Sequence, residues 1–372
     1  MHTPSDCFSA SYAQARDAFR TAAEAAGLQV ISYLHPLPGR EAEALTMDVV
    51  IDGDPRAEAR LIVSSACHGA EGFAGSGVQV GALLDADLRD EARRNGVAVV
   101  HLHALNPYGF SHLSRTTHEN VDLNRNFLDF SGPLPVNEPY RRVHPLLVPD
   151  RWPPPAESEA ALMEIMQSEG TRALQAVVTR GQYEFVDGLF FGGAEPSWSN
   201  LTLRQVLREV GSGARRLAWI DLHTGLGPPG FGERILGCEP GAAEARAREW
   251  WGEVTSVHDG SSSSTFLTGL MWTAVRDECP NAEYTGIALE FGTVPVVDVL
   301  QALRADNWLR ANRRTGRSPV PEELVREIGR QMLEAFFVDT DDWKVKVLSQ
   351  GREAISQAIR GLSSESSPQG SS

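Results

Sequence analysis

The sequence predicts an α/β fold: a mixed, mainly parallel, twisted sheet flanked by helices and followed by a helical C-terminal extension. Two β-prone runs, at 60–67 and 97–104, are apolar enough to be buried on both faces, as strands of a parallel sheet are. A predicted helix over 73–94 separates them, and this order favours a parallel pair joined by a crossover. After Thr293 the pattern is helical almost to the end.

The first element expected is a helix over 10–26, because apolar residues recur at helical spacing and Gly27 stands where a helix end favours glycine. Short β-prone runs predict strands over 28–34, 45–51, 60–67, 97–104, 215–222 and 284–291. Helical periodicity predicts helices over 73–94, 157–180, 199–210, 295–312, 321–337 and 341–361. We therefore expect one sheet of about eight strands.

Three segments are expected to lack regular structure. Residues 129–156 contain eight prolines, which interrupt helices and strands, so an irregular insertion is predicted. Between 222 and 284 we expect glycine-, proline- or serine-rich loops, in which the tract from Ser261 to Thr265 fits a solvated linker or a mobile lid. The serine-rich residues 363–372 predict a disordered tail.

Composition excludes several classes of function. The formal net charge is −15, so non-specific binding to nucleic acid or to an anionic membrane is not expected. The four cysteines are scattered without a C-x-x-C pair, which disfavours a thiolate zinc site and suits a reducing compartment. Neither a basic segment followed by an apolar stretch at the N-terminus nor a run of about 18 apolar residues occurs, so we expect a cytoplasmic protein.

A candidate metal site begins in LIVSSACHGAEG, where His68 follows an apolar run and Glu71 stands three residues later. Open α/β sheets place their ligands at the carboxyl ends of strands. One helical turn brings residues i and i+3 to the same side, so both side chains could hold one metal ion. For this pattern taken alone, a helix-capping glutamate and a solvent-facing histidine are the alternative.

Two later strands carry matching groups. In WIDLHTGLG, Trp219, Asp221 and His223 alternate onto one face, and His223 stands at the strand end. Two histidines and one carboxylate leave a position for water, which is typical of catalytic rather than structural zinc. Glu290 lies near the end of the apolar run TGIALEFG, where a carboxylate must be paired, protonated or functional. A salt-bridged structural glutamate is the alternative there.

These residues belong to a series of segments that occur in a familiar order and approximate spacing: His68-Gly69-Ala70-Glu71, Asn106-Pro107-Tyr108-Gly109, Arg115, Asp122-Leu123-Asn124-Arg125-Asn126-Phe127, Asp221-Leu222-His223 and Glu290. The series resembles the zinc carboxypeptidase superfamily, the M14 metallopeptidases with their succinylglutamate desuccinylase and aspartoacylase relatives. The sequence motifs HTGLGP and LEFGT are most similar to those of a bacterial branch of this superfamily, the DUF2817 family. The resemblance covers residues 60–295 and implies a zinc carboxypeptidase-like fold.

The resemblance implies that His68, Glu71 and His223 bind one Zn²⁺ per chain. It also implies that Glu290 is the general base that acts on the zinc-bound water. The residue chemistry agrees, because zinc lowers the pKa of a bound water towards about 7 and a neighbouring carboxylate can take the proton.

The same resemblance implies roles for four further residues. Arg115 would stabilise the oxyanion that forms on the attacked carbonyl. Asn124 and Arg125 would hold a substrate carboxylate, which suits the planar guanidinium. Asp122 would accept a hydrogen bond from His68 and so fix its tautomer. For Arg125, a structural pair with an acidic neighbour such as Asp129 is the alternative.

The other histidines are expected to be structural. His101 and His103 share one face of a predicted strand and are interpreted as hydrogen-bonded packing residues, with metal binding as the alternative. His118 stands in a polar turn that favours a surface loop. His258 precedes the serine-rich tract, where a role next to the substrate is the alternative to a surface position.

We therefore expect one zinc-hydrolase catalytic domain over residues 1–362, with a core over 28–312 and a helical C-terminal part over 313–362. Its expected reaction is that of a zinc metallopeptidase of carboxypeptidase type, which hydrolyses an amide bond next to a free carboxylate. Two alternatives stay open. One is a deacylase of N-acyl amino acids, and the other is an inactive protein that uses Arg125 to bind an anion. The expected partner is a peptide or N-acyl amino acid with a free carboxylate.

Overall fold

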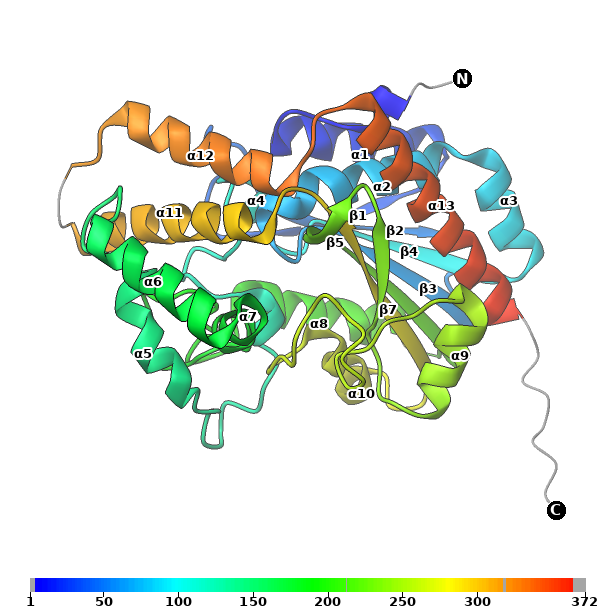
Figure 1. Cartoon of the computed structure of the whole chain (residues 1–372). Helices are drawn as coiled ribbons and strands as arrows, with labels where there is room; N and C mark the ends of the chain where they lie inside the picture. The colour runs from blue at the N-terminus through cyan, green and yellow to red at the C-terminus, as the bar shows by residue number, and fades with distance from the viewer. Residues whose placement is uncertain (1–3, 212, 317–318, 364–372) are drawn as a thin grey trace, which may run out of the picture.

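The computed structural model describes residues 4–211, 213–316 and 319–363. In this part of the chain seven strands form one sheet, in the order β1-β2-β4-β3-β5-β7-β6 (Figure 1). The strands are β1 Val30–Leu34, β2 Thr46–Asp52, β3 Ala59–Ser64, β4 Val97–His103, β5 Arg216–Pro229, β6 Gly232–Leu236 and β7 Glu283–Gly292. Strands β4, β3, β5 and β7 are parallel, while β1–β2, β2–β4 and β6–β7 are antiparallel pairs. The predicted mixed sheet with a parallel core is confirmed, with seven strands among the described residues instead of the expected number of about eight.

Helices cover both faces of this sheet (Figure 1). Apolar side chains of α2, α9 and α13 pack on one face, with α1 beside α2, and those of α8 and α10 pack on the other. The helices are α1 Tyr12–Ala25, α2 Gly72–Leu84, α3 Ala86–Arg94, α4 Pro107–Ser111, α5 Glu138–Leu147, α6 Ala156–Glu169, α7 Thr171–Thr179, α8 Trp198–Gly211, α9 Ala242–Trp251, α10 Ala274–Glu278, α11 Val296–Thr315, α12 Glu322–Phe336 and α13 Asp341–Ser363.

The expectation of loops throughout 222–284 is wrong. β5 continues to Pro229, β6 follows, and α9 and α10 occupy further parts of the segment. The backbone of Gly225 has a φ of +130°, and the register between β5 and β7 shifts between Thr224 and Pro229. β6 is a short edge strand that pairs with β7 alone among the described strands, so tertiary pairing rather than local composition decides its conformation.

Three predicted boundaries also need correction. The helix expected over 73–94 is two helices, because Asp85 leaves the helical region and caps α3 through the backbone N–H of Leu88. The helix expected over 157–180 divides at Gly170, whose φ is +94°. The segment 129–156 is not irregular throughout, because α5 accommodates one proline in its first turn and a second near its end.

The chain after Thr293 is helical as predicted: α11 lies mainly in the predicted core and ends at Thr315, and α12 and α13 form the helical C-terminal region. In α13, Val347, Ile355 and Ile359 are buried in the same core cluster as Leu61 and Ile220 of the central strands. The predicted tail, apart from the final residue of α13, lies outside the described residues. None of the described helices is long and apolar enough to cross a membrane.

His101 and His103 are buried in β4. The Nε2 atom of His103 lies 2.9 Å from Ser76 Oγ, and its ring stacks on Phe19 at 4.6 Å between centroids. Burial lowers the pKa of each imidazole to about 4, although Asp52 and Asp48, respectively, act in the opposite direction. Neither residue belongs to a group of metal-binding geometry among the described residues, in agreement with a packing role.

We expect the free energy of unfolding to fall as the pH decreases from about 6.5 to about 4. In this window both histidines bind protons in the unfolded chain but not in the folded chain. Their contribution to the free energy of unfolding is therefore present above the unfolded pKa and is lost as the pH falls towards the folded pKa of about 4. Across this window each buried histidine lowers the free energy of unfolding by at most about 3 kcal/mol. Urea unfolding at several pH values should show a shallower slope for His103→Asn and an unchanged slope for a control, His258→Asn, at an exposed position. An unchanged slope in His103→Asn would contradict the assignment.

Candidate functional site

Three strand ends meet at the candidate site. His68 follows β3 and caps the short 3-10 helix η2 Gly69–Glu71, so Glu71 is carried back towards it within one turn. His223 lies in β5 directly opposite Glu290 of β7 in the parallel register. Because parallel strands end at the same edge of a sheet, four residues from distant parts of the chain converge there. The alternative of a solvent-facing His68 is wrong, since its side chain is buried.

His68, Glu71 and His223 form a compact donor group. His68 Nδ1 lies 2.8 Å from Glu71 Oε1, and His223 Nδ1 lies 2.9 Å from Glu71 Oε2. One ligand atom from each residue lies within 4.8 Å of the others. The three ligand atoms are therefore close enough together to bind one cation.

Each imidazole is oriented by a carboxylate on its opposite nitrogen. His68 Nε2 lies 3.2 Å from Asp122 Oδ1, and His223 Nε2 lies 2.6 Å from Asp221 Oδ2. Asp221 is itself fixed by Ser64, whose hydroxyl donates to Oδ1 at 2.5 Å. Carboxylates that orient metal-binding histidines in this way raise the basicity of the nitrogen that faces the metal.

This donor set fits Zn²⁺. Two imidazole nitrogens and one carboxylate, each held by further hydrogen bonds, are a usual set for catalytic zinc and leave a position open for water or substrate. A second group of suitable geometry, Cys67 with Asp221 and His223, shares two of these residues. Burial raises the pKa of the Cys67 thiol, which disfavours the thiolate that a metal would need.

Charges in the site are strongly coupled. Burial opposes ionisation of Glu71, but the adjacent His68 and His223 hold the pKa of its carboxyl below the ordinary value. Burial also opposes the charged form of His223, yet Asp221 and Glu71 keep the pKa of this imidazole above its ordinary value.

Glu290 is separate from the donor group. Its Oε1 atom accepts a hydrogen bond from the backbone N–H of Leu226 at 3.0 Å. Burial, together with the negative charge of Glu71, raises the pKa of Glu290 to about 8. No ion pair of Glu290 is found among the described residues, so the alternative of a salt-bridged structural glutamate is not supported by contacts.

Arg115 lies directly against the donor group. Its Nε donates to Asp122 Oδ2 at 2.9 Å, and its Nη1 donates to Glu71 Oε1 at 3.3 Å. The ring of Phe190 packs against this guanidinium, 4.8 Å from centroid to Cζ. A fixed positive charge therefore lies beside the donor group.

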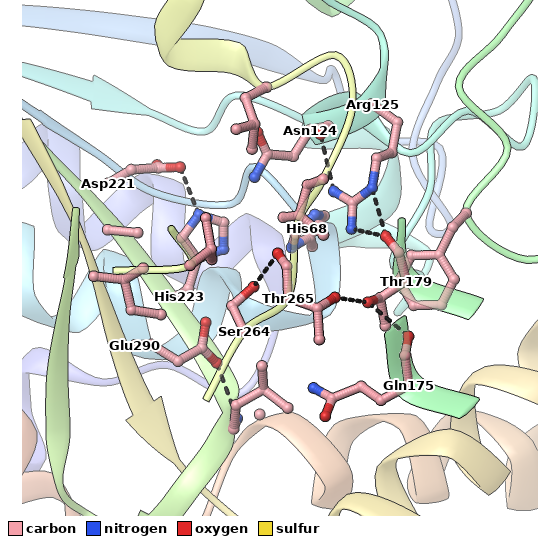
Figure 2. A pocket seen from close by; sticks show the side chains of 18 of the residues that line it. His68, Asn124, Arg125, Gln175, Thr179, Asp221, His223, Ser264, Thr265 and Glu290 are labelled. Carbon is pink, nitrogen blue, oxygen red and sulfur yellow. Dashed lines mark hydrogen bonds and ion pairs between the residues drawn. The ribbon is translucent and has the colours of Figure 1, made fainter. Parts of the chain in front are cut away.

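Asn124 and Arg125 lie at the opposite end of the site from Glu290 (Figure 2). Nε and Nη2 of Arg125 donate to the carbonyl of Thr179, and Nη1 donates to that of Asn124. Its Nη1 lies 3.9 Å from Asp122, while Asp129 is bonded to Ser131 instead. The acidic neighbour of Arg125 is therefore Asp122 and not Asp129, so the alternative of an arginine beside an acidic neighbour holds with a different partner. The guanidinium is held rigidly by backbone carbonyls while it still lines the cavity.

A cavity of about 390 Å³ joins these groups. Ser264 and Thr265, at the end of the serine-rich tract from Ser261 to Thr265, line this cavity (Figure 2), and the tract is not a free linker. Arg172 of α7 donates to the carbonyls of Ser262, Ser263 and Ser264, at 2.8 to 3.1 Å. Glu233 of β6 accepts from the backbone N–H of Ser263 at 2.9 Å. The tract is thus anchored on both sides of the cavity.

His258 and His118 lie in different parts of the molecule. His258 lies along the cavity and is exposed, so a position beside substrate is available to it. His118 pairs with Glu119 at 3.0 Å and lies away from the donor group, beside a different hollow. Its expected loop position agrees with the structure.

Sequence reasoning gave no role to Asp221 or to Phe190. For Asp221 a signal exists, because a residue two positions before His223 in a strand shares its face. Nothing local marks Phe190, since its contact with Arg115 depends on the folded path of the 180–191 segment.

We expect Asp221→Asn to weaken metal affinity by about 10- to 100-fold, because the amide cannot replace the carboxylate that holds His223 Nε2. Competition with a chelator of known affinity measures this change. Asp277→Asn, at a half-exposed aspartate on α10, is the matched control and should leave the affinity unchanged. Equal affinity for Asp221→Asn and wild type would show that Asp221 does not support a metal ligand.

A family model described as "Protein of unknown function (DUF2817)" matches residues 8–350. No curated protein matches the chain. Three similar solved structures are thrombin activatable fibrinolysis inhibitor (12% identity, 92% of this chain and 77% of that chain, TM-score 0.45), a metallo-carboxypeptidase from Burkholderia cenocepacia (11%, 90% and 68%, 0.41) and the ectoine utilization protein EutE (DoeB) from Ruegeria pomeroyi (12%, 77% and 67%, 0.33). At these identities the likeness concerns the fold and not the activity.

Proposed function

The chain belongs to the DUF2817 family, and we propose that it is a zinc-dependent hydrolase of carboxypeptidase type, which cleaves an amide bond next to a free carboxylate. The observation that carries this proposal is the convergence of His68, Glu71 and His223, with Glu290 beside them and Arg125 at the far end of the same cavity. A donor set, a separate carboxylate and a rigid cation are the parts that such hydrolysis needs.

His68, Glu71 and His223 would hold the zinc. The ion, when bound, supplies Lewis acidity and lowers the pKa of water. Glu290, whose carboxyl pKa of about 8 would fall beside a bound cation, takes a proton from the attacking water on its carboxylate and later passes it to the leaving amine. Arg115 holds the oxygen of the attacked carbonyl as it becomes negative, with Phe190 shielding its guanidinium.

The substrate carboxylate binds between Asn124 and Arg125. Met271 N–H donates to Asn124 Oδ1 at 2.9 Å, which fixes the amide and turns its donor end to the cavity. Carboxypeptidase action and N-acyl amino acid deacylation share this anchor and the bond that breaks. They differ only in the acyl part of the substrate.

The test is metal analysis together with hydrolysis of blocked dipeptides and N-acyl amino acids. We expect about one zinc per chain, removable by a chelator with loss of hydrolysis and restored by added zinc. His223→Ala should lose both metal and activity, whereas the control His258→Ala should keep the metal. Hydrolysis that survives complete removal of metal, or a protein that binds none when zinc is supplied, would overturn the proposal.

A further inference from the structure

One side of the cavity is an apolar wall built from four helices. We call it the helical wall, and its main members are Met166 of α6, Leu174 and Val178 of α7, Val299 and Leu303 of α11, and Phe336 of α12. All but Met166 are buried members of one core cluster, and Met166 packs against that cluster. Among the described residues that line the cavity from these four helices, none is charged. The wall therefore offers apolar surface to whatever occupies the cavity.

The helical wall extends away from the carboxylate anchor. Thr179, at the end of α7, accepts the hydrogen bonds of Arg125, and Leu174 lies five residues earlier, about 7 Å back along the helix. Figure 2 shows Arg125 and Asn124 at one end, Glu290 and Gln175 towards the other, and helices beyond them.

Phe336 of the helical wall lies close to His223 and Glu290. Its carbonyl accepts a hydrogen bond from Thr224, the neighbour of His223, at 2.7 Å. A Cβ atom added at Gly225 would lie 2.9 Å from the Phe336 ring and 3.8 Å from Glu290 Oε1. The proposed function places the amine side of the scissile bond towards Arg125. The acyl side then lies on the other side of that bond, towards Phe336 and the helical wall.

The wall provides few partners for a peptide backbone. Its polar members include Gln175, whose Nε2 already donates to the Ser263 carbonyl, and Thr179, whose hydroxyl donates to the Gln175 carbonyl and lies 2.9 Å from that of Thr265. A peptide that extended along this wall would bury N–H and C=O groups without partners, which costs binding free energy. A hydrocarbon chain has no such groups and gains from burial.

We propose that the helical wall binds a long aliphatic acyl group, so that the preferred substrates are N-acyl amino acids with a long-chain acyl part. This inference rests on the proposed function for the bond that is broken. It extends the proposed function by naming the class of acyl group that the substrate carries.

The first experiment compares N-acyl phenylalanines that differ only in chain length: acetyl, butanoyl, octanoyl and dodecanoyl. Phenylalanine is chosen because Trp219, Met271 and Trp272 line the cavity near Asn124. We expect kcat/KM to rise by about threefold to fourfold for each methylene that the wall buries. A tripeptide ending in phenylalanine should be hydrolysed more slowly than the dodecanoyl compound. A flat series, or a preference for the tripeptide, would overturn the inference.

The second experiment places a charge on the wall. Leu300 of α11 lines the cavity and is only partly buried, so Leu300→Asp should fold. It should lower kcat/KM for dodecanoyl-phenylalanine by more than about tenfold and change that for the acetyl compound by less than about threefold. Leu201→Asp, at a leucine of α8 that is 56% exposed and outside the cavity, is the matched control and should have no effect. Equal losses for both acyl compounds in Leu300→Asp would contradict a role in acyl recognition.

A third measurement separates this inference from the proposed function. Dodecanoyl-phenylalanine and acetyl-phenylalanine are titrated into metal-free protein by calorimetry, where hydrolysis does not interfere. Tighter binding of the dodecanoyl compound that is lost in Leu300→Asp would support the wall even if no substrate were cleaved, and the proposed hydrolysis alone would then fail. Equal affinity for both compounds would overturn the acyl assignment even in an active enzyme.

Discussion

Glu290→Gln is expected to lower kcat by about 100-fold or more while the metal content stays at the wild-type level. Glu290 lies opposite His223 in the sheet but outside the group of three donors, so its loss should not release the metal. Glutamine keeps an oxygen that can accept the hydrogen bond from Leu226, and the local structure should therefore persist. Because an amide cannot take up the proton of the attacking water, the chemical step is the one that slows.

Steady-state kinetics on the best substrate, together with metal analysis of the same preparation, measures both quantities. Glu239→Gln is the matched control, because Glu239 also lines the cavity but its side chain is 64% exposed. This control should retain activity near the wild-type level. Turnover of Glu290→Gln that equals wild type would remove Glu290 from the mechanism.

Substrates with a free α-carboxylate should be preferred over their amides by about 2 to 4 kcal/mol, or about 30- to 800-fold in kcat/KM. The reason is the position of Arg125, buried and fixed by the carbonyls of Thr179 and Asn124. Burial lowers the pKa of its guanidinium, so the site gains by acquiring a negative partner. An amidated substrate would leave Asp122, 3.9 Å from Nη1, as the acidic partner of that buried cation, without the closer carboxylate that a free-acid substrate supplies.

Arg125→Lys should remove most of this preference without loss of metal, because lysine cannot bond two carbonyls and a carboxylate in one plane. Lysine is a better test than alanine, which would leave the Thr179 carbonyl without a donor. Arg180→Lys, at an exposed arginine nearby, is the control and should leave the preference unchanged. If wild-type enzyme cleaves free-acid and amidated forms equally well, Arg125 has a structural role only.

The parallel core of the fold could be predicted because its strands are continuous apolar runs separated by a helical pattern. The same logic failed for β6, whose five residues pair only with β7 among the described strands and are not strand-like by themselves. It also failed for α5, where proline content suggested irregular structure although one proline occupies a position that a helix tolerates.

The candidate site was predictable to the extent that its residues follow strand ends. His68 follows β3 and Glu290 lies near the end of β7, and the sheet register brings His223 opposite Glu290, although β5 continues beyond His223 to Pro229. The helical wall was not predictable in this way. Leu174 and Val299 lie on apolar helix faces, which are indistinguishable in sequence from faces that pack in a core.

During synthesis on a ribosome, α13 is the last of the described helices to emerge. Its buried side chains complete the cluster that covers Leu61 and Ile220, so a chain that stops before α13 leaves this face of the sheet exposed. Nascent chains that can already form the parallel strands therefore present a large apolar surface for a time, which makes them substrates for chaperones and prone to aggregation. A chain that terminates before α13 should accordingly yield insoluble protein rather than a shortened active one.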